Sequence, residues 1–110
     1  MNLLAPKFAG SGYSDDLLAA KLAALSHPAR LSILRYLSGN GACCCKEVVD
    51  QLDLAQSTVS QHLKILVDCG LVRFAPERQR SRYSVDRDEV AQLSRALATY
   101  LDACSSGCCG

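Results

Sequence analysis

Seven cysteines in a chain of 110 residues are its most reactive feature. They are Cys43, Cys44, Cys45, Cys69, Cys104, Cys108 and Cys109. A disulfide scaffold is typical of small secreted domains, but here the count is odd and the N-terminus lacks a basic-then-apolar signal pattern. Clustered thiols in a reducing cytosol bind soft metals or sense redox state. We therefore predict thiol chemistry for the two triplets, and interpret Cys69 as a small buried residue.

A second group of reactive side chains lies in the stretch LAQSTVSQHLKILVDCG, residues 54–70. Val59, Leu63, Leu66 and Val67 recur at helical spacing and predict an amphipathic helix that stops at Gly70. Its other faces carry polar groups that can contact base edges or phosphates. These are Ser57, Thr58, Ser60, Gln61, His62 and Lys64. The alternative is a solvated amphipathic helix of any small bundle.

The segment after this helix is basic, although the net charge of the whole chain is only +1. Residues 71–74 and 82–85 are predicted to form two strands, with Tyr83 and Val85 pointing inward. The polar turn between them presents Arg78, Gln79 and Arg80 to phosphates. A short helix, a turn, the helix described above and a hairpin, in that order, predict a mainly helical winged helix-turn-helix.

The remaining helices supply the frame for these two groups. Ser14 is predicted to cap a first helix that runs to about residue 25, and His27 to cap a second that starts at Pro28. The second helix is expected to reach residue 38. The three consecutive cysteines are expected to open a third helix, which ends before the turn at residues 53–55.

The last helix is predicted to start at Asp86 or Asp88 and to carry one apolar seam. The seam consists of Val90, Leu93, Leu97, Leu101 and Cys104. A helix with this much apolar surface cannot bury all of it on a small domain. We therefore expect dimerisation through the terminal helices. The alternative is that the helix caps the core of a monomer.

The expected organisation is a flexible arm at 1–14, a winged-helix DNA-binding and dimerisation domain at 15–103, and a cysteine-rich tail at 104–110. No apolar run is long enough to span a membrane. We therefore expect a cytoplasmic protein without a membrane partner.

Four segments together resemble the ArsR/SmtB family of metal-responsive repressors. They are ALSHPARLSILRYL (24–37), CCCKEVVDQL (43–52), STVSQHLKILVDCGLV (57–72) and RYSVD (82–86). The resemblance implies a homodimeric repressor that releases double-stranded operator DNA when an inducer binds. It implies that Ser57, Thr58, Ser60, Gln61 and His62 face the major groove, and that Arg78, Gln79 and Arg80 touch the backbone or minor groove. Ala55 departs from the family pattern, because relatives often have a helix-capping Ser there.

The resemblance also narrows the choice of inducer. Zinc sensors of the terminal-helix type need His and carboxylate ligands on that helix, but the two histidines here, His27 and His62, lie elsewhere. Arsenical sensors of this family use thiolates, either Cys-x-Cys at the start of the third helix or three cysteines around the end of the last. Cys43, Cys44 and Cys45 contain the first spacing. Cys104, Cys108 and Cys109 resemble the second with its order inverted.

Soft thiolates suit trivalent arsenic and antimony, which take three sulfur ligands. A helix N-terminus is expected to lower the pKa of the thiols there. Adjacent helical cysteines diverge by about 100°, so three can converge only around an irregular first turn. The predicted inducer is arsenite, methylarsenite or antimonite, bound by either triplet or by a composite of both.

Three alternatives remain open. The first is a redox or persulfide sensor that joins one of Cys43, Cys44 and Cys45 to Cys104 or a tail cysteine. The second is a cadmium or lead sensor of the same fold. The third, from another class, is a thiol enzyme such as a metalloid reductase. The sequence shows no catalytic Cys loop, anion cradle or Cys/His pair, and this argues against such an enzyme.

Overall fold

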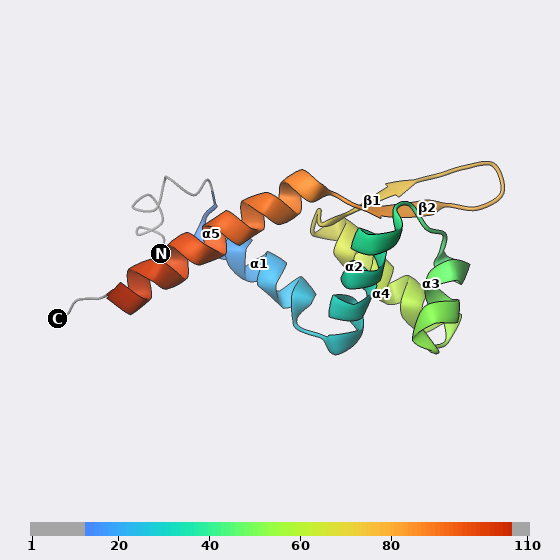
Figure 1. Ribbon diagram of the computed structural model, residues 1–110, viewed down its shortest axis with the longest axis horizontal. Coiled ribbons are helices and arrows are strands. Elements are labelled where there is room, and N and C mark those ends of the chain that lie inside the picture. The colour runs from blue at the N-terminus through green and yellow to red at the C-terminus, as the bar shows by residue number, and fades with distance from the viewer. Residues whose placement is uncertain (1–12, 107–110) are drawn as a thin grey trace.

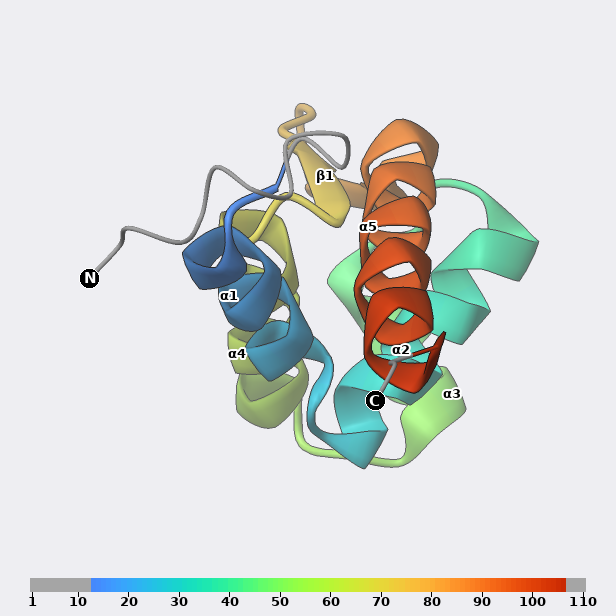
Figure 2. The same cartoon turned by 90° about the vertical axis from the view of Figure 1, so that its left-hand side faces the viewer.

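The structure, a computed structural model, describes residues 13–106 as five helices and one β-hairpin. In chain order these are α1 (Asp15–Leu25), α2 (Pro28–Asn40), α3 (Cys45–Leu52), α4 (Gln56–Asp68), β1 (Val72–Ala75), β2 (Arg82–Val85) and α5 (Arg87–Ser106). Helices α2, α3 and α4 pack together, the hairpin extends beyond them, and α5 runs back along α1 (Figures 1 and 2). The predicted winged helix-turn-helix is confirmed.

Local capping signals set the helix starts as predicted. The Ser14 hydroxyl accepts a hydrogen bond of 3.1 Å from the backbone N–H of Leu17. The Nδ1 atom of His27 accepts one of 3.0 Å from the N–H of Ala29, and Pro28 occupies the first turn of α2. Helix α2 continues to Asn40, two residues beyond the expected end, and stops at Gly41, whose φ of 70° favours glycine.

Two apolar clusters hold the fold together. The larger joins α2, α3, α4 and the hairpin around Ile33, Val48, Leu63 and Leu66. The smaller joins α1, α5 and the end of α4, and its buried members are Tyr13, Leu18, Leu71, Leu93 and Ala96. Tyr13 is only 8% exposed, so the prediction that the flexible arm extends to residue 14 is wrong at that end. Residues 1–12 lie outside the described part of the chain.

The hairpin forms the wing. Val72 pairs with Val85 and Phe74 with Tyr83, and both inward residues of β2 pack on the larger cluster, as predicted. Cys43 forms a further β-bridge with Tyr83 through backbone hydrogen bonds of 2.9 and 2.8 Å. The prediction that all three cysteines open α3 is therefore wrong: Cys43 is extended, Cys44 is the N-cap and only Cys45 is helical.

Helix α5 starts after Asp86, whose carboxylate accepts a 3.2 Å hydrogen bond from the N–H of Glu89. It continues through Ser106, and the hydroxyls of Ser105 and Ser106 donate to the carbonyl of Asp102. Cys104 is thus helical, and the expected tail does not begin at residue 104. Cys108 and Cys109 lie outside the described residues. No helix within residues 13–106 is long and apolar enough to cross a membrane.

Candidate DNA-binding and thiol site

Helix α4 presents a polar face to solvent. Ser57, Ser60, Gln61 and Lys64 are exposed, and Thr58 is half-buried at the edge of that face. On the opposite face Val59, Leu63 and Leu66 are completely buried. A one-residue left-handed turn at Asp53, with φ 56°, lies between α3 and α4. This is the arrangement in which a second helix enters a DNA groove while the first braces it.

His62 lies away from the exposed face. Its ring packs against that of His27, with 4.5 Å between ring centroids, and its Nδ1 atom is buried. Burial, followed by the neighbouring His27 and Arg30, lowers the pKa of His62 below its ordinary value. The imidazole of His62 therefore packs α4 against the start of α2. The family resemblance instead implies that His62 faces the major groove with Ser57 and Gln61.

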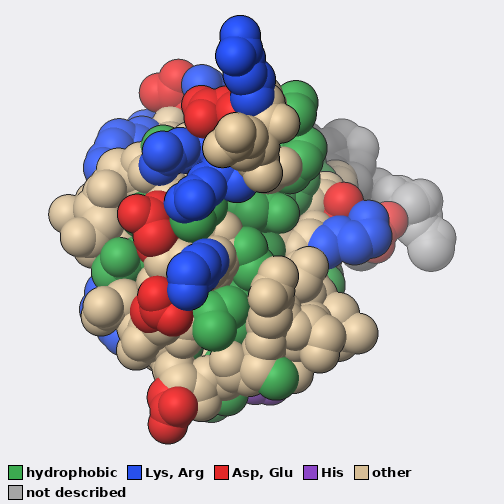
Figure 3. Space-filling model, turned by 90° about the vertical axis from the view of Figure 1, so that its right-hand side faces the viewer, with side chains coloured by type: hydrophobic (Ala, Val, Ile, Leu, Met, Phe, Trp, Pro, Cys, Tyr) green, Lys and Arg blue, Asp and Glu red, His purple; other side chains and the backbone are tan. Residues whose placement is uncertain are grey.

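The wing carries most of the exposed cationic groups at one end of the molecule. Figure 3 shows Lys and Arg side chains spread over this end, with Asp and Glu between them. Arg73 is paired with Asp86 at 3.1 Å, and Arg82 with Glu77 at 3.4 Å. Arg78 and Gln79 are exposed at the turn. These two side chains are available to contact a nucleic-acid backbone.

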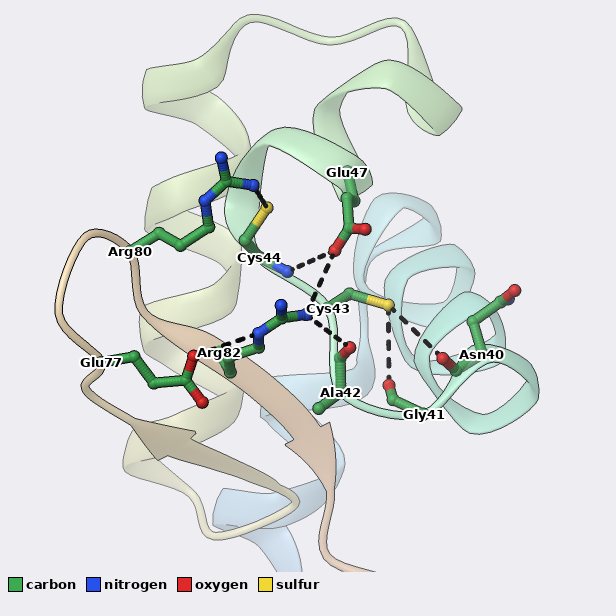
Figure 4. Close-up of polar contacts among 9 residues, drawn as sticks. All are labelled: Asn40, Gly41, Ala42, Cys43, Cys44, Glu47, Glu77, Arg80 and Arg82. Carbon is green, nitrogen blue, oxygen red and sulfur yellow. Dashed lines mark hydrogen bonds and ion pairs between the residues drawn. The ribbon is translucent and has the colours of Figure 1, made fainter.

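The side chains of Cys43 and Cys44 point in different directions (Figure 4). The sulfur of Cys43 lies 3.8 Å from the carbonyl oxygen of Asn40 and 3.6 Å from that of Gly41. The sulfur of Cys44 accepts from Nη1 of Arg80 at 3.6 Å, and Cys45 packs against the larger cluster. Among residues 13–106, no three Cys, His, Asp or Glu side chains converge into a metal-sized group. The first triplet is not a preformed three-sulfur site in this conformation.

The thiols at the start of α3 also differ electrostatically from the prediction. Burial, and next the nearby Glu47, raise the pKa of Cys43. Burial, and next Cys44, raise the pKa of Cys45. The expectation that the helix terminus lowers the thiol pKa is therefore wrong for these two. Instead, the carboxylate of Glu47 accepts a 2.8 Å hydrogen bond from the backbone N–H of Cys44, which lowers the pKa of Glu47.

Cys104, the member of the second triplet that the structure describes, is remote from the first triplet within one chain. Cys104 is exposed near the end of α5, at the opposite end of the molecule from α3 (Figure 1). A composite of Cys104 with the first triplet therefore cannot form within a single chain in this conformation.

Contacts between segments far apart in sequence join the first triplet to the wing. Arg82 donates from Nη1 to the carbonyl of Ala42 at 3.2 Å and lies 3.8 Å from the carboxylate of Glu47. An open groove of about 330 Å³ separates α3 from the outer part of the wing. It is lined by Cys44, Cys45, Lys46, Gln56, Arg80, Ser81 and Tyr83. Sequence reasoning missed this connection.

Sequence reasoning also missed Lys21. Its side chain is buried, donates to the carbonyl of Cys69 at the end of α4, and pairs with Glu89 of α5 at 3.2 Å. Lys21 of α1 therefore links the end of α4, the second helix of the helix-turn-helix, to α5. A signal was available, because Lys21 interrupts the apolar stripe of α1 three residues after Leu18.

A helix-turn-helix with an exposed polar second helix and a basic hairpin beside it defines a winged-helix DNA-binding protein. Residues 27–73 match the family model described as "Bacterial regulatory protein, arsR family". A probable mercury resistance operon repressor of Streptomyces lividans is 36% identical over 97 residues, covering 86% of this chain and 76% of the relative. The chain belongs to the ArsR family of transcriptional repressors.

Other relatives agree. An arsenical resistance operon repressor of Staphylococcus xylosus is 30% identical over 91 residues, 83% of this chain and 86% of the relative. The solved ArsR-like regulator of Rhodococcus sp. RHA1 superposes with a TM-score of 0.72 at 25% identity, covering 83% and 85% of the two chains. A homodimeric winged helix-turn-helix domain of Mycobacterium bovis gives 0.65 at 27% identity, covering 80% and 81%. These relatives are regulators, so the alternative of a thiol enzyme is set aside.

Proposed function

We propose that this protein represses a resistance operon and leaves its operator when trivalent arsenic or antimony binds its cysteine thiolates. The observation that carries the proposal is the run Cys43–Cys45 at the junction of α2 and α3, directly against the wing. Thiolates are soft ligands that select thiophilic centres over hard cations. Relatives that repress arsenical and mercury resistance operons support the same class of inducer.

The proposed protein–DNA contacts follow exposure. Ser57, Ser60 and Gln61 read base edges in the major groove, and Thr58 contributes at its edge. Lys64 and the wing residues Arg78 and Gln79 contact phosphates or the minor groove. Arg80, which the resemblance also places there, donates to the sulfur of Cys44 in the DNA-free protein. We assign His62 a supporting role, because its ring packs on His27.

We further propose that the protein acts as a homodimer through α5. Tyr100 and Leu101 of that helix are 39% and 52% exposed, so residues 13–106 leave apolar surface uncovered on the second half of α5. A two-fold dimer would present two recognition helices to successive major grooves. The homodimeric M. bovis domain has the same fold.

The chemistry of the first triplet fits the inducer, but its resting geometry does not. Three sulfurs are available within three residues, yet Cys43 and Cys44 point apart. Binding therefore requires the first turn of α3 to rearrange, beside Gly41. Cys104, Cys108 and Cys109 form the second proposed ligand set.

The test is operator binding by fluorescence anisotropy, using protein reduced with a thiol-free phosphine. The titrants are arsenite, methylarsenite, antimonite, cadmium, lead, mercury and hydrogen peroxide. The wild type is compared with two triple variants and with the variant that combines all six substitutions. The triple variants are Cys43→Ser, Cys44→Ser, Cys45→Ser, and Cys104→Ser, Cys108→Ser, Cys109→Ser. We expect release by trivalent arsenic or antimony, lost in one triple variant only. Release that persists when all six cysteines are replaced would refute the proposal.

A second candidate is a redox or persulfide sensor of the same fold. The observation that favours it is the Arg80 guanidinium 3.6 Å from the sulfur of Cys44, since a cation beside a thiol is common at reactive cysteines. Release by peroxide alone, reversed by the phosphine, would establish this function. Release by cadmium or lead alone would make the protein a sensor of those ions.

A further inference from the structure

The wing is attached to the cysteine run at two levels. At its base, Cys43 and Tyr83 share two backbone hydrogen bonds, and Arg82 donates to the carbonyl of Ala42. Closer to the turn, the guanidinium of Arg80 reaches across to the sulfur of Cys44 at 3.6 Å (Figure 4). The base contacts use backbone groups or Arg82, so a change at the Cys44 thiol leaves them in place. The outer contact depends on that thiol.

The groove between α3 and the wing gives a ligand access to this outer contact. Cys44 and Cys45 line one side, and Arg80, Ser81 and Tyr83 line the other. Its volume of about 330 Å³ exceeds that of several water molecules, whose share of the liquid is about 30 Å³ each. An inducer that takes the Cys44 sulfur would occupy the space into which Arg80 now reaches.

We propose that Cys44 and Arg80 form the link through which the cysteine run controls the grip of the wing on DNA. In the inducer-free protein, Arg80 anchors the outer half of the hairpin to the N-cap of α3, so the wing is ordered before it meets DNA. Ordering a segment in advance lowers the cost of binding. When a ligand occupies the sulfur, Arg80 loses its acceptor and the turn that carries Arg78 and Gln79 loses its anchor.

This inference rests on the proposed function for the role of the wing at the operator, but its test needs no inducer. We expect Cys44→Ala to weaken operator binding about three- to tenfold, the range for loss of one hydrogen bond. Cys44→Ser should retain most of the affinity, because its hydroxyl is still an acceptor. Cys45→Ala is the matched control, since Cys45 adjoins the same groove without bonding to Arg80.

A double-mutant cycle isolates the link from other effects of either substitution. In the Arg80→Ala background, Cys44→Ala should have no further effect on operator affinity. In the Arg78→Ala background, it should weaken binding as much as in the wild type, because Arg78 is also at the turn but does not contact Cys44. Thermal unfolding of each variant checks that the fold is intact.

An additive cycle between Cys44 and Arg80 overturns the link, whether or not metalloids release the operator. Failure of every metalloid to release the wild-type protein overturns the proposed inducer, while the cycle still reports on the link. Hydrogen exchange gives a structural readout: the amides of Ala75 and Arg82, the last strand pair before the turn, should exchange faster in Cys44→Ala, and those of Arg73 and Ser84, nearer the wing base, should not change.

Discussion

Replacing Lys21 by methionine tests how the recognition helix is held. Lys21 is only 6% exposed. Its ammonium group donates to the Cys69 carbonyl, lies 3.2 Å from the carboxylate of Glu89 and is 5.8 Å from the centre of the Tyr13 ring. A hydrogen bond to a charged donor contributes about 1.5–3 kcal/mol. The Glu89 pair adds little, because that carboxylate is one-third exposed. Methionine keeps the apolar part of the side chain, so we expect the free energy of unfolding to fall by about 2 kcal/mol through loss of the hydrogen bond alone.

The assay is urea unfolding followed by circular dichroism at one fixed protein concentration, because dimerisation would make stability concentration-dependent. Lys46→Met is the matched control, since Lys46 also pairs with a carboxylate, Asp50 at 3.8 Å, but its side chain is 76% exposed. Such a surface pair contributes less than about 0.5 kcal/mol. Similar losses in the two variants would refute the structural role of Lys21.

Three further predictions test local features. Ala55 gives α4 no side-chain cap, so Ala55→Ser should raise the free energy of unfolding by about 1 kcal/mol in the same urea assay; no gain would mean that the helix start is already satisfied. The native pKa of His62 lies below its ordinary 6.5, so the unfolded chain binds its proton first, and stability should fall as pH drops through about 6.5. His62→Asn should reduce that loss; an unchanged pH profile would refute it. In a Cys108→Ser, Cys109→Ser variant diluted until it is monomeric, iodoacetamide should modify exposed Cys104 before Cys43 and Cys44, which are 3% exposed, as peptide mass spectrometry would show; the reverse order would contradict this.

The parts of the fold predicted correctly are those fixed by signals within a few residues. Ser14 and the His27-Pro28 pair mark helix starts because capping involves neighbouring backbone groups. The period of Val59, Leu63 and Leu66 identifies the recognition helix because burial of one face repeats every turn. The hairpin follows from the alternation around Tyr83.

The errors arise where a distant segment decides the local conformation. Cys43 reads as the first residue of a helix, but its backbone bonds to Tyr83, forty positions later in the chain. Burial by that packing also raises the pKa of Cys43, which a prediction based on the helix terminus alone could not include. The sequence predicts His62 as a polar surface residue, but the ring of His27, the N-cap of α2, packs against it. Tyr13 is expected in the flexible arm, but it packs in the smaller cluster with Leu93 and Ala96 of α5.

The terminal helix shows why one apolar pattern left two interpretations open. Its seam is continuous in sequence, yet Leu93 is buried within the chain while Leu101 is half exposed. The first half of α5 therefore serves the protomer, and the second half has apolar surface to offer a partner. Cys104 belongs to this second half, whereas Cys44 touches the wing. A ligand at the second triplet would act on the spacing of the two recognition helices, and a ligand at the first would act on the wing of each protomer separately. Cys104 and the first triplet lie at opposite ends of the described fold, so ligands at these two places would weaken the same DNA contact in two different ways.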